Sequence, residues 1–329
     1  MKKYKWGILG PGKIAGKFSE ALATLGNAEL WAVGSRDAGR AAGFAGRYGY
    51  ARSYGSYEEL VRDPELDVVY IASPHSHHHE HTLLCLGHGK NVLCEKAFAL
   101  NTGEVEEMIL MAGKKNLFLM EALWPPFQPS YREADALIES GEMGKVVAIS
   151  GRFGFMAPYS ADARTYNLAL GGGSLLDIGI YPLMDILRYM GMPSAITAVA
   201  SFAPTGADES MLAVLGYTDD RRATAYSSFI EDAGVGTTIV LEGGKIILER
   251  NRDRYQYLII EKAGAEPVTK KFRPEVNGFE LEAEEVMRCL DEGLIESPVV
   301  THRFSTDLMM LLDGVRKAAG ISYPGRDIG

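Results

Sequence analysis

A glycine-rich turn, Gly10-Pro-Gly-Lys-Ile-Ala15, lies between the first apolar run of the chain and its first helical pattern. In this G-x-G-x-x-A spacing, the first glycine permits a tight turn, the second lets a pyrophosphate approach the backbone, and the small third residue lets helix and strand pack closely. The N–H groups at the start of the helix then face the anion. The turn therefore favours a dinucleotide-binding unit over an ordinary glycine-rich loop. The predicted cofactor contacts here are Gly10, Gly12, Lys13, Ile14 and Ala15.

The first third of the chain repeats the order of strand followed by helix. Short apolar runs are separated by segments whose apolar residues recur every three or four positions, as along one face of a helix. Strands that alternate with helices in this rhythm form right-handed βαβ units, in which helices cover both faces of a parallel sheet. We therefore predict an α/β Rossmann domain with a doubly wound parallel sheet over residues 1–122. Its predicted strands are 6–9, 30–33, 67–73, 91–94 and 117–120.

The pattern changes near residue 122. A proline-rich segment, 124–129, ends the alternation, and longer strand patterns with hairpin-type turns follow it. We predict a C-terminal α+β domain over residues 123–329, with a large, mostly antiparallel open sheet. The last helix, about 304–319, is a candidate to pack back on the first domain. The predicted strands of the second sheet are 146–155, 196–202, 211–217, 223–230, 237–241 and 245–249.

Composition limits the class of partner. A chain of 329 residues is long enough for two domains. Its net charge of −9 argues against a nucleic-acid footprint and against a polybasic membrane anchor. The chain has three cysteines, an odd number, and no pair has C-x-x-C spacing. A disulfide framework is therefore not expected, which favours a reducing compartment. The longest charge-free stretch, 191–207, contains two prolines and is not typical of a membrane span. We expect a soluble, cytoplasmic protein.

The end of the second predicted strand bears on the choice of cofactor. An acid that binds the adenosine ribose 2′-hydroxyl of NAD should lie about 20 residues beyond the glycines. This place holds Ser35 and Arg36, whose hydroxyl and guanidinium suit the 2′-phosphate of NADP. Two other interpretations stay open: Ser35 caps the next helix beside a solvated Arg36, or Asp37 is the missing acid. We prefer NADP, with NAD possible.

Three further segments identify a family resemblance. Residues 73–80 (S-P-H-S-H-H-H-E) and 94–97 (C-E-K-A) follow later strands, where ligands collect in such sheets, and residues 171–181 read G-G-G-S-L-L-D-I-G-I-Y. In this order, and over nearly the whole chain, the sequence resembles the glucose–fructose oxidoreductase/inositol dehydrogenase (Gfo/Idh/MocA) family. It looks closest to the dimeric dihydrodiol dehydrogenase-like branch, because the late motif ends in D-x-G-x-Y and residues 120–124 read M-E-A-L-W.

The resemblance implies roles for the residues that follow the later strands. It implies that Pro74 lies against the nicotinamide, that Glu95 contacts the cofactor and that Lys96 faces the reacting carbon. The sequence departs from the family at Ala97, where proline is usual, and this puts the local backbone geometry in doubt. It also departs at His75, where many members have asparagine. Further predicted cofactor contacts in this region are Ser73, His75 and His78.

Histidines are concentrated in the segment 75–81, which holds five of the seven in the chain. A metal site is one interpretation, since imidazole is a common zinc ligand. However, consecutive histidines point in different directions, and neither a cysteine nor a second acidic cluster completes a ligand set. We predict no metal. His78 matches the recurrent histidine of the family and is interpreted as a positioning residue, and His77, His79 and His81 as residues on the helix surface.

The predicted chemistry is hydride transfer with movement of a hydroxyl proton. Lys96 supplies a cation that can polarise the substrate oxygen, and Tyr181 a phenol that can donate to it. Asp177, four residues before Tyr181 on a helical face, can bind a substrate hydroxyl and influence Lys96. Taken singly, Asp177 could be a helix N-cap and Tyr181 a core aromatic. Together with Glu95 and Lys96, they favour a catalytic set of Lys96, Tyr181 and Asp177.

Aromatic side chains suit the apolar face of a sugar ring or a cyclic diol. Candidate substrate residues are Trp124, Arg152, Phe155 and Phe279, although each could be simple packing. We predict an NADP-dependent oxidoreductase that acts on a secondary alcohol or ketone of a sugar, cyclitol or cyclic diol. Two rivals are redox-neutral glycoside cleavage with tightly held NAD and a non-catalytic sensor. The family resemblance also implies a homodimer formed through the open sheet.

Overall fold

The computed structural model describes residues 2–250 and 255–325, which divide into two compact units. The first unit combines Met1–Phe127 with Glu275–Thr306, and the second combines Gln128–Pro274 with Asp307–Gly329. This division differs from a single boundary near residue 122, because the chain returns to the first unit late in the sequence. The segment that returns holds one complete helix and only the start of the last one.

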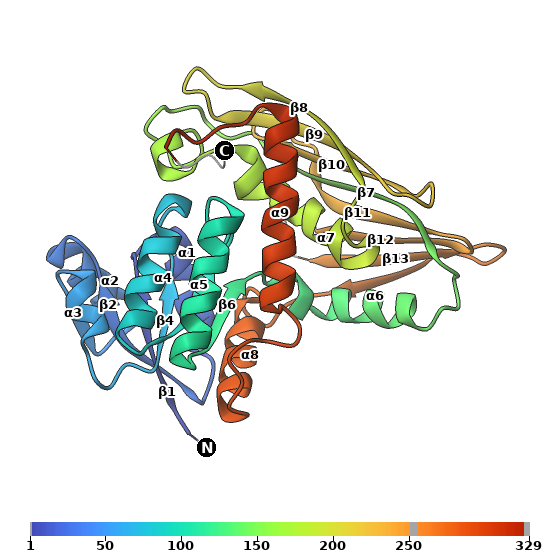
Figure 1. Cartoon of the computed structure of the whole chain (residues 1–329). Helices are drawn as coiled ribbons and strands as arrows, with labels where there is room; N and C mark the ends of the chain where they lie inside the picture. Colours follow the sequence, from blue (N-terminus) through green and yellow to red (C-terminus); the bar gives the residue numbers. More distant parts are fainter. Residues whose placement is uncertain (1, 251–254, 326–329) are drawn as a thin grey trace. The chain divides into compact units, whose positions relative to one another are not determined.

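The first unit contains a six-stranded sheet in the order β3-β2-β1-β4-β5-β6. Every pair of neighbouring strands is parallel, as the alternation of strand and helix predicts (Figure 1). All residues of β4 and β6 are buried, which is typical of a parallel sheet covered on both faces. The strands are β1 (Tyr4–Leu9), β2 (Ala28–Gly34), β3 (Arg52–Tyr54), β4 (Val68–Ile71), β5 (Asn91–Glu95) and β6 (Leu119–Ala122).

Helices of the first unit follow the strands, and several begin with a side-chain cap. Asp37, Ser56 and Asn101 each accept the backbone N–H three residues ahead, which satisfies one of the unpaired donors at a helix start. The apolar faces of the helices pack on the sheet: the ring of Phe18 stacks on that of Tyr70 with centroids 3.8 Å apart. The helices are α1 (Lys13–Leu22), α2 (Ala38–Tyr48), α3 (Tyr57–Val61), α4 (His78–Gly87), α5 (Thr102–Lys115) and α8 (Phe279–Asp291).

The second unit contains an eight-stranded sheet in the order β14-β13-β12-β11-β7-β10-β9-β8. Its pairs are antiparallel except β7–β10, so the predicted, mostly antiparallel sheet is confirmed. Sequence analysis missed β13 and β14. β14 is a largely exposed strand without an apolar alternation, whereas β13 alternates between more and less buried residues and could have been recognised. The strands are β7 (Val146–Gly154), β8 (Ala195–Phe202), β9 (Asp208–Gly216), β10 (Arg222–Ser228), β11 (Gly234–Leu241), β12 (Gly244–Arg250), β13 (Gln256–Lys262) and β14 (Val268–Phe272).

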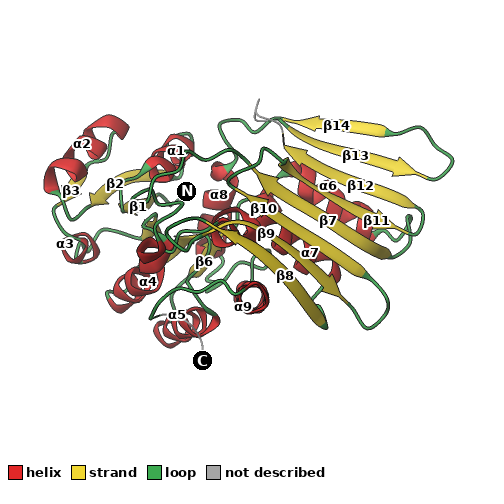
Figure 2. Ribbon diagram, turned by 90° about the horizontal axis from the view of Figure 1, so that it is seen from above, coloured by secondary structure: helices red, strands yellow, loops and turns green. Residues whose placement is uncertain are grey.

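Helices α6 (Pro129–Glu139) and α7 (Ile180–Met190) lie on one face of this sheet (Figure 2). Alternate residues of the strands point to this face and are buried, whereas their neighbours point to the other face. On that other face, large apolar side chains remain exposed in the chain as described. They include Val147, Val199, Leu212, Val214 and Val240. The last helix, α9 (His302–Ala319), begins in the segment of the first unit and ends in that of the second.

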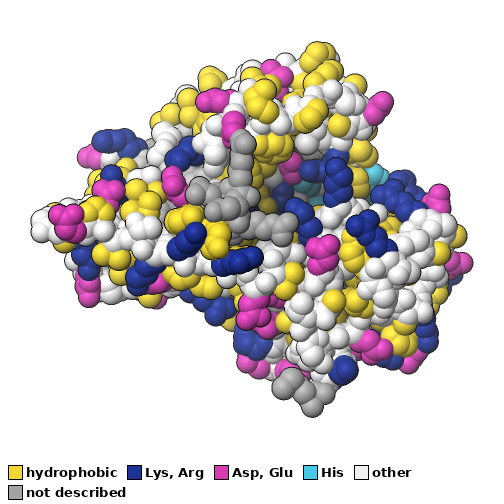
Figure 3. Space-filling view, turned by 180° about the vertical axis from the view of Figure 1, so that it is seen from behind, with side chains coloured by type: hydrophobic (Ala, Val, Ile, Leu, Met, Phe, Trp, Pro, Cys, Tyr) yellow, Lys and Arg dark blue, Asp and Glu magenta, His cyan; other side chains and the backbone are white. Residues whose placement is uncertain are grey.

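One helical stretch, Leu168–Met190, is long and apolar enough to cross a membrane by length and composition alone. However, 89% of its most apolar window is buried inside the fold. It is therefore accounted for as a core helix beneath the eight-stranded sheet. On the face of the protein shown in Figure 3, acidic and basic side chains are interspersed over much of the surface, in keeping with the moderate net charge.

Candidate active site

The turn between β1 and α1 has the geometry of an anion cradle. Gly10 has φ +91°, a conformation that favours glycine, and a Cβ there would lie 3.1 Å from the backbone nitrogen of Ser73. A Cβ at Gly12 would meet nothing within 4 Å, so the space in front of the helix start is open. Gly12 occupies the N-cap position without a capping side chain, and Ala15 is fully buried. These residues fit the pyrophosphate of a dinucleotide.

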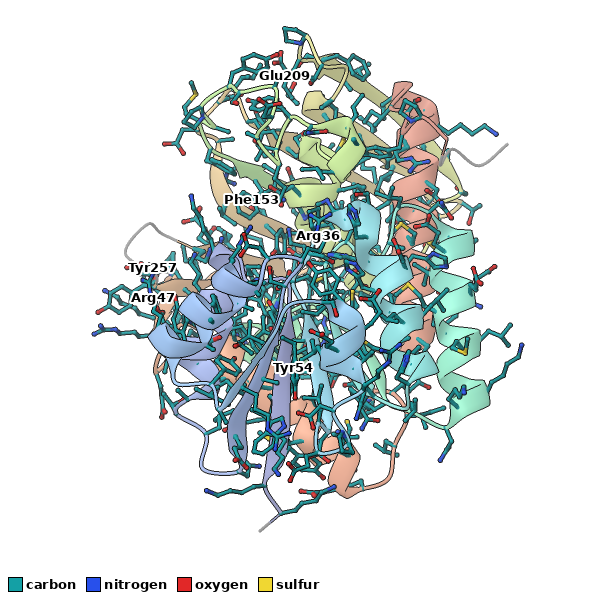
Figure 4. All side chains as sticks on the ribbon, turned by 90° about the vertical axis from the view of Figure 1, so that its left-hand side faces the viewer. Arg36, Arg47, Tyr54, Phe153, Glu209 and Tyr257 are labelled. Atoms are coloured by element: carbon teal, nitrogen blue, oxygen red, sulfur yellow. The ribbon has the colours of Figure 1, made fainter. Side chains whose placement is uncertain are left out.

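Ser35 and Arg36 follow β2 at the same edge of the sheet. Ser35 is buried, and its Oγ accepts the Asp37 N–H at 3.2 Å. Asp37 Oδ1 accepts the Arg40 N–H at 2.9 Å, so the candidate acid caps α2. Arg36 is exposed (Figure 4). Sequence analysis missed Arg40, whose guanidinium donates to the Pro11 carbonyl at 2.9 and 3.2 Å and joins α2 to the glycine turn.

His78, the first residue of α4, joins the loops that follow β4 and β5. Its Nδ1 lies 2.8 Å from the Ala97 carbonyl oxygen, and its Nε2 lies 2.8 Å from the Ser73 carbonyl oxygen. Burial lowers the pKa of His78 to about 4, against the effect of these two carbonyls. The ring therefore lies between two loops that sequence analysis assigns to the nicotinamide end, one of which contains Pro74. As a neutral imidazole it donates its one N–H to one of the two carbonyl oxygens.

The remaining histidines are not all on the helix surface. His81 is 6% exposed, its Nδ1 lies 2.9 Å from Ser73 Oγ, and burial lowers its pKa to about 3. The prediction of a surface position is wrong for His81, because this side of α4 turns towards the loop after β4. His75 is also buried, whereas His79 pairs with the exposed Glu107. Among the residues that the structure describes, no three His, Cys, Asp or Glu side chains form a group that could hold a metal ion.

Glu95 and Lys96 lie at the end of β5. Glu95 is 7% exposed and accepts a short hydrogen bond from the Tyr70 hydroxyl. Lys96 is partly buried, and the peptide bond that joins it to Ala97 is cis. In the sheet order, β1, β4 and β5 are consecutive neighbours. The glycine turn, the Ser73 loop and Lys96 therefore share one edge of the first unit, where parallel sheets bind their ligands.

In the second unit, Asp177 lies within a π-helical turn, Leu175–Gly179, that precedes α7. Its carboxylate receives two bonds from the Arg164 guanidinium, both at 3.0 Å, in a bidentate pair. Asp177 is thus not a helix N-cap, and its spacing to Tyr181 is not that of a regular α-helix. Such π-helical turns are rare and frequent at functional sites. Sequence analysis missed Arg164, because it lies in a loop without a recognisable motif.

Tyr181 lies in the first turn of α7 and is partly buried against aromatic side chains of the same unit. Its ring centroid is 5.4 Å from that of Phe153 on β7, which is labelled in Figure 4. The predicted Phe155 is 6.4 Å from Phe153 and 5.5 Å from Phe229, between centroids. The Arg250 guanidinium lies 5.5 Å from the Phe153 centroid. Sequence analysis missed Phe153, since strand alternation alone did not distinguish it from Phe155.

Arg152 lies on the face of β7 opposite to that of Phe153. A Cβ on Gly151 would be 2.7 Å from Pro182 of α7, so residues 151 and 153 face that helix and Arg152 faces away from it. Arg152 forms an ion pair with Glu249 at 3.1 Å and donates to the Ala233 carbonyl. The structure does not bring Arg152 together with Tyr181. In the first unit, by contrast, the predicted Trp124 and Phe279 do meet, with ring centroids 6.1 Å apart.

Comparisons with known proteins identify the family of the chain. The family described as "Oxidoreductase family, NAD-binding Rossmann fold" matches residues 4–123, and the "GFO/IDH/MocA C-terminal domain" matches residues 131–247. Among curated relatives, the trans-1,2-dihydrobenzene-1,2-diol dehydrogenase of Xenopus tropicalis is 37% identical and that of Mus musculus is 35% identical. Each alignment covers 97% of this chain and 98–99% of the relative.

Solved structures share the fold. Levoglucosan dehydrogenase in complex with NADH and levoglucosan has a TM-score of 0.87 at 19% identity, over 97% of this chain and 98% of that one. KijD10, a 3-ketoreductase from Actinomadura kijaniata in complex with NADP and TDP-benzene, has a TM-score of 0.86 at 23% identity, with the same coverage. At these identities the likeness shows the fold alone. It confirms the predicted pairing of a Rossmann sheet with a large, mostly antiparallel one.

Proposed function

The chain belongs to the Gfo/Idh/MocA family of oxidoreductases, and from this premise we propose that it transfers a hydride between NADP and a secondary alcohol or ketone of a cyclic diol, sugar or cyclitol. One observation carries the proposal. The glycine turn after β1 and the Glu95–Lys96 pair after β5 lie at the same edge of one parallel sheet. His78 lies between the loops after β4 and β5 at that edge, with a different ring nitrogen 2.8 Å from a carbonyl oxygen of each loop.

The nicotinamide supplies the carbon that gives or accepts the hydride. The capping role of Asp37 supports NADP over NAD, because its carboxylate is engaged with the Arg40 N–H while Arg36 is exposed. A guanidinium can donate to a 2′-phosphate in a bidentate way. The residues proposed to hold the cofactor are Gly10, Gly12, Lys13, Ile14, Ala15, Ser35, Arg36, Ser73, Pro74, His75, His78, Glu95 and Lys96.

Lys96 and Tyr181 are proposed to act on the substrate oxygen. In the direction of reduction, Tyr181 Oη gives its proton to the carbonyl oxygen as the carbonyl carbon takes up the hydride. The Lys96 ammonium donates a hydrogen bond to the same oxygen and stabilises the negative charge that develops there. A free phenol has a pKa near ~10, so a neighbouring ammonium would also help the tyrosinate to form.

Asp177 and Arg164 are proposed to orient the substrate. The bidentate bonds from Arg164 fix the direction of the carboxylate. We propose that Asp177, as a carboxylate acceptor, receives a bond from a hydroxyl next to the reacting carbon. This role suits a vicinal diol or a sugar, both of which carry a neighbouring hydroxyl.

The aromatic residues are proposed to bind the apolar face of a ring. Trp124 and Phe279 form one pair, and Phe153 with Phe155 forms another. The names of the curated relatives make trans-1,2-dihydrobenzene-1,2-diol the first substrate to test. The names of the structural neighbours add levoglucosan and, from the 3-ketoreductase, a ketone. Arg152 is left out of the proposed site because it faces away from Tyr181.

We also propose a cytoplasmic homodimer in which the open face of the eight-stranded sheet is the interface. Exposed apolar side chains occur on that face. They include Val199 on β8 and Leu212 and Val214 on the neighbouring β9, and Val147 on β7, which is separated from β9 by β10. Burying them against a second copy would remove apolar surface from water.

The experiment that tests the proposal is a turnover screen with purified enzyme. Cyclic 1,2-diols, sugars and cyclitols are offered with NADP and NAD, and keto-sugars with NADPH and NADH, while nicotinamide absorbance and product are both followed. We expect one mole of NADPH for each mole of diol or sugar oxidised. Glycoside cleavage without net change of cofactor would favour the redox-neutral rival, and binding without turnover of any compound would favour the sensor.

A further inference from the structure

The M-E-A-L-W segment contains a buried acid, Glu121, that the proposed reaction does not use. Glu121 lies on β6 opposite Cys94 of β5 and is 1% exposed. Its Oε1 accepts the Phe98 N–H at 3.0 Å, a bond that is itself buried. Phe98 is two residues after Lys96. The carboxyl therefore holds the backbone immediately beyond the lysine.

The charged neighbours of Glu121 come mainly from the end of β5. Burial raises the pKa of Glu121 to about 7, and Glu95 raises it too, whereas the Ser305 hydroxyl, the Phe98 N–H and Lys96 lower it. Burial also raises the pKa of Cys94, so this thiol is neutral. Among these groups Lys96 is the positive one. Because Lys96 lowers the pKa of Glu121, the ionised Glu121 carboxylate in turn favours the charged form of the Lys96 ammonium.

We propose that Glu121 is a positioning residue for Lys96: it fixes the backbone after the lysine and serves as the counter-charge that keeps the lysine amine protonated. The inference rests on the proposed role of Lys96 in the reaction. Glu121 acts through the lysine and is not assigned a contact with substrate. Its effect as a counter-charge appears only at pH values where it is ionised, whereas its bond to the Phe98 N–H does not require ionisation. This pH dependence distinguishes it from a purely structural side chain.

The variant Glu121→Gln tests the counter-charge alone. The amide oxygen can still accept the Phe98 N–H, whereas the negative charge is lost at every pH. We expect the kcat profiles of variant and wild type to coincide below about pH 6, where wild-type Glu121 is protonated. Above it, the alkaline limb of the variant should lie about one pH unit lower, because Lys96 loses its proton more readily. Glu121→Asp restores the charge and should return the limb towards its wild-type position.

A second readout does not depend on turnover. Competitive acetylation of the lysine amines in the cofactor-free enzyme, followed by peptide mass spectrometry, reports the pKa of the Lys96 amine. We expect Glu121→Gln to lower this pKa by about one unit. NADPH affinity, measured by fluorescence, should stay unchanged, and this binding also shows that the variant is folded.

Glu282→Gln is the matched control. Glu282 is a glutamate of the same unit and is fully buried, and among the described residues neither of its carboxyl oxygens has a hydrogen-bond partner. Burial, with a smaller contribution from Glu95, raises its pKa well above the usual range, which favours the neutral form that glutamine resembles. The control should leave both the kcat profile and the Lys96 pKa unchanged.

The outcomes separate this inference from the proposed function. If Glu121→Gln shifts neither the alkaline limb nor the Lys96 pKa while Lys96→Met abolishes turnover, the role of Glu121 is wrong and that of Lys96 stands. If Lys96→Met turns over normally, the proposed role of Lys96 fails whatever Glu121 does. A shift of equal size in Glu282→Gln would assign the effect to general disturbance of the core and overturn the inference.

Discussion

The candidate residues of the first unit follow parallel strands directly, whereas those of the second lie on a helical segment held by side chains from distant parts of the chain. Gly10 and Lys96 come within two residues of β1 and β5, and the sheet alone brings the ends of these strands to one edge. Asp177 and Tyr181 do not follow strands of a parallel sheet. Their positions depend on partners that the surrounding sequence does not reveal.

In the second unit, a buried network of hydrogen bonds holds the π-helical turn that contains Asp177. Asp208, at the start of β9, accepts the Leu175 N–H at 2.7 Å and the Ser174 hydroxyl at 2.9 Å, and so caps the π-helical turn. Ser174 Oγ also lies 2.9 Å from Ser227 Oγ on β10. Gly173, with φ +137°, leaves room for the carboxyl, since a Cβ there would lie 2.1 Å from Asp208 Oδ1. The second unit thus uses tertiary contacts where the first uses strand ends.

The largest effect that sharpens this contrast is expected at the Asp177–Arg164 pair. Asp177→Asn removes the charge that Arg164 orients, and kcat/KM for a diol should fall by about 10²-fold, as for loss of a charge-assisted bond made to substrate. Arg164→Lys keeps the positive charge but cannot form the bidentate bond of the guanidinium, and it should lower kcat/KM by less than Asp177→Asn does. NADPH affinity should not change in either variant. A loss of NADPH affinity as large as the loss of kcat/KM would place the pair at the cofactor instead.

The first unit is tested at Arg36. Arg36→Ala should raise the KM for NADP by roughly tenfold or more, because one charge-assisted contact is worth about 1.5–3 kcal/mol, and leave that for NAD little changed. Arg47→Ala is the control, since Arg47 lies in the last turn of α2 over the Tyr48 ring. An unchanged ratio of NADP to NAD preference would refute the cofactor assignment.

A smaller effect is expected in the pH dependence of stability. Burial raises the pKa of Asp208 to about 7, above the ~4 of an exposed aspartate. The folded state thus holds this proton more tightly than the unfolded state, so the stability it contributes is present below about pH 4 and lost as the pH rises through about 7. Between about pH 4 and about pH 7, the free energy of unfolding measured in urea should fall less for Asp208→Asn than for wild type.

Asp63 of the first unit gives the opposite sign. Burial would raise its pKa, yet hydrogen bonds from the Glu65 N–H, Tyr54 and Trp31 outweigh burial and lower it. Its contribution to stability is therefore present above the ordinary aspartate pKa and lost as the pH falls. If the free energies of unfolding of Asp208→Asn and Asp63→Asn changed with pH at the same rate, the pKa directions assigned to both carboxyls would be contradicted.

The smallest effect on activity is expected at the open face of the eight-stranded sheet. Leu212 is 42% exposed there, and Leu212→Glu places a charge on the proposed dimer interface. Light scattering should give a dimer mass for wild type at micromolar concentration and a monomer mass for the variant, with kcat nearly retained. A wild-type monomer would refute the dimer.

Much of the first unit could be predicted from the sequence because its information is local. The Gly10–Ala15 turn, the strand rhythm and the Glu95–Lys96 pair are each contiguous, and the rules for parallel sheets bring them to one edge. His81 was misplaced because a cluster of histidines at the start of a helix does not reveal which of them point to the buried side. The return of α8 to the first unit was also missed, since no short motif marks a chain that changes units.

In the second unit the sequence predicted the kind of sheet, which is confirmed. It also indicated Asp177 and Tyr181 as candidate catalytic residues, which stay a prediction, but it did not reveal the side chains that hold them. Arg164 lies 13 residues from Asp177, and Asp208 lies 33 residues from Leu175. Such contacts are formed by tertiary folding and produce no recognisable spacing in the sequence. Arg152 and Phe153 illustrate the same limit, because strand alternation separates two faces without saying which of them meets α7.

The most direct test of the central claim, that Lys96 and Tyr181 act as one unit on the substrate oxygen, is single-turnover hydride transfer with saturating NADPH. Tyr181→Phe keeps the ring and removes the acid, so the rate should fall by ~10²–10⁴ while NADPH affinity stays nearly constant. Lys96→Met should cost at least as much, and the double variant should be little worse than the worse single one. Near-normal rates in both single variants would contradict the claim and mean that the active site has been misplaced.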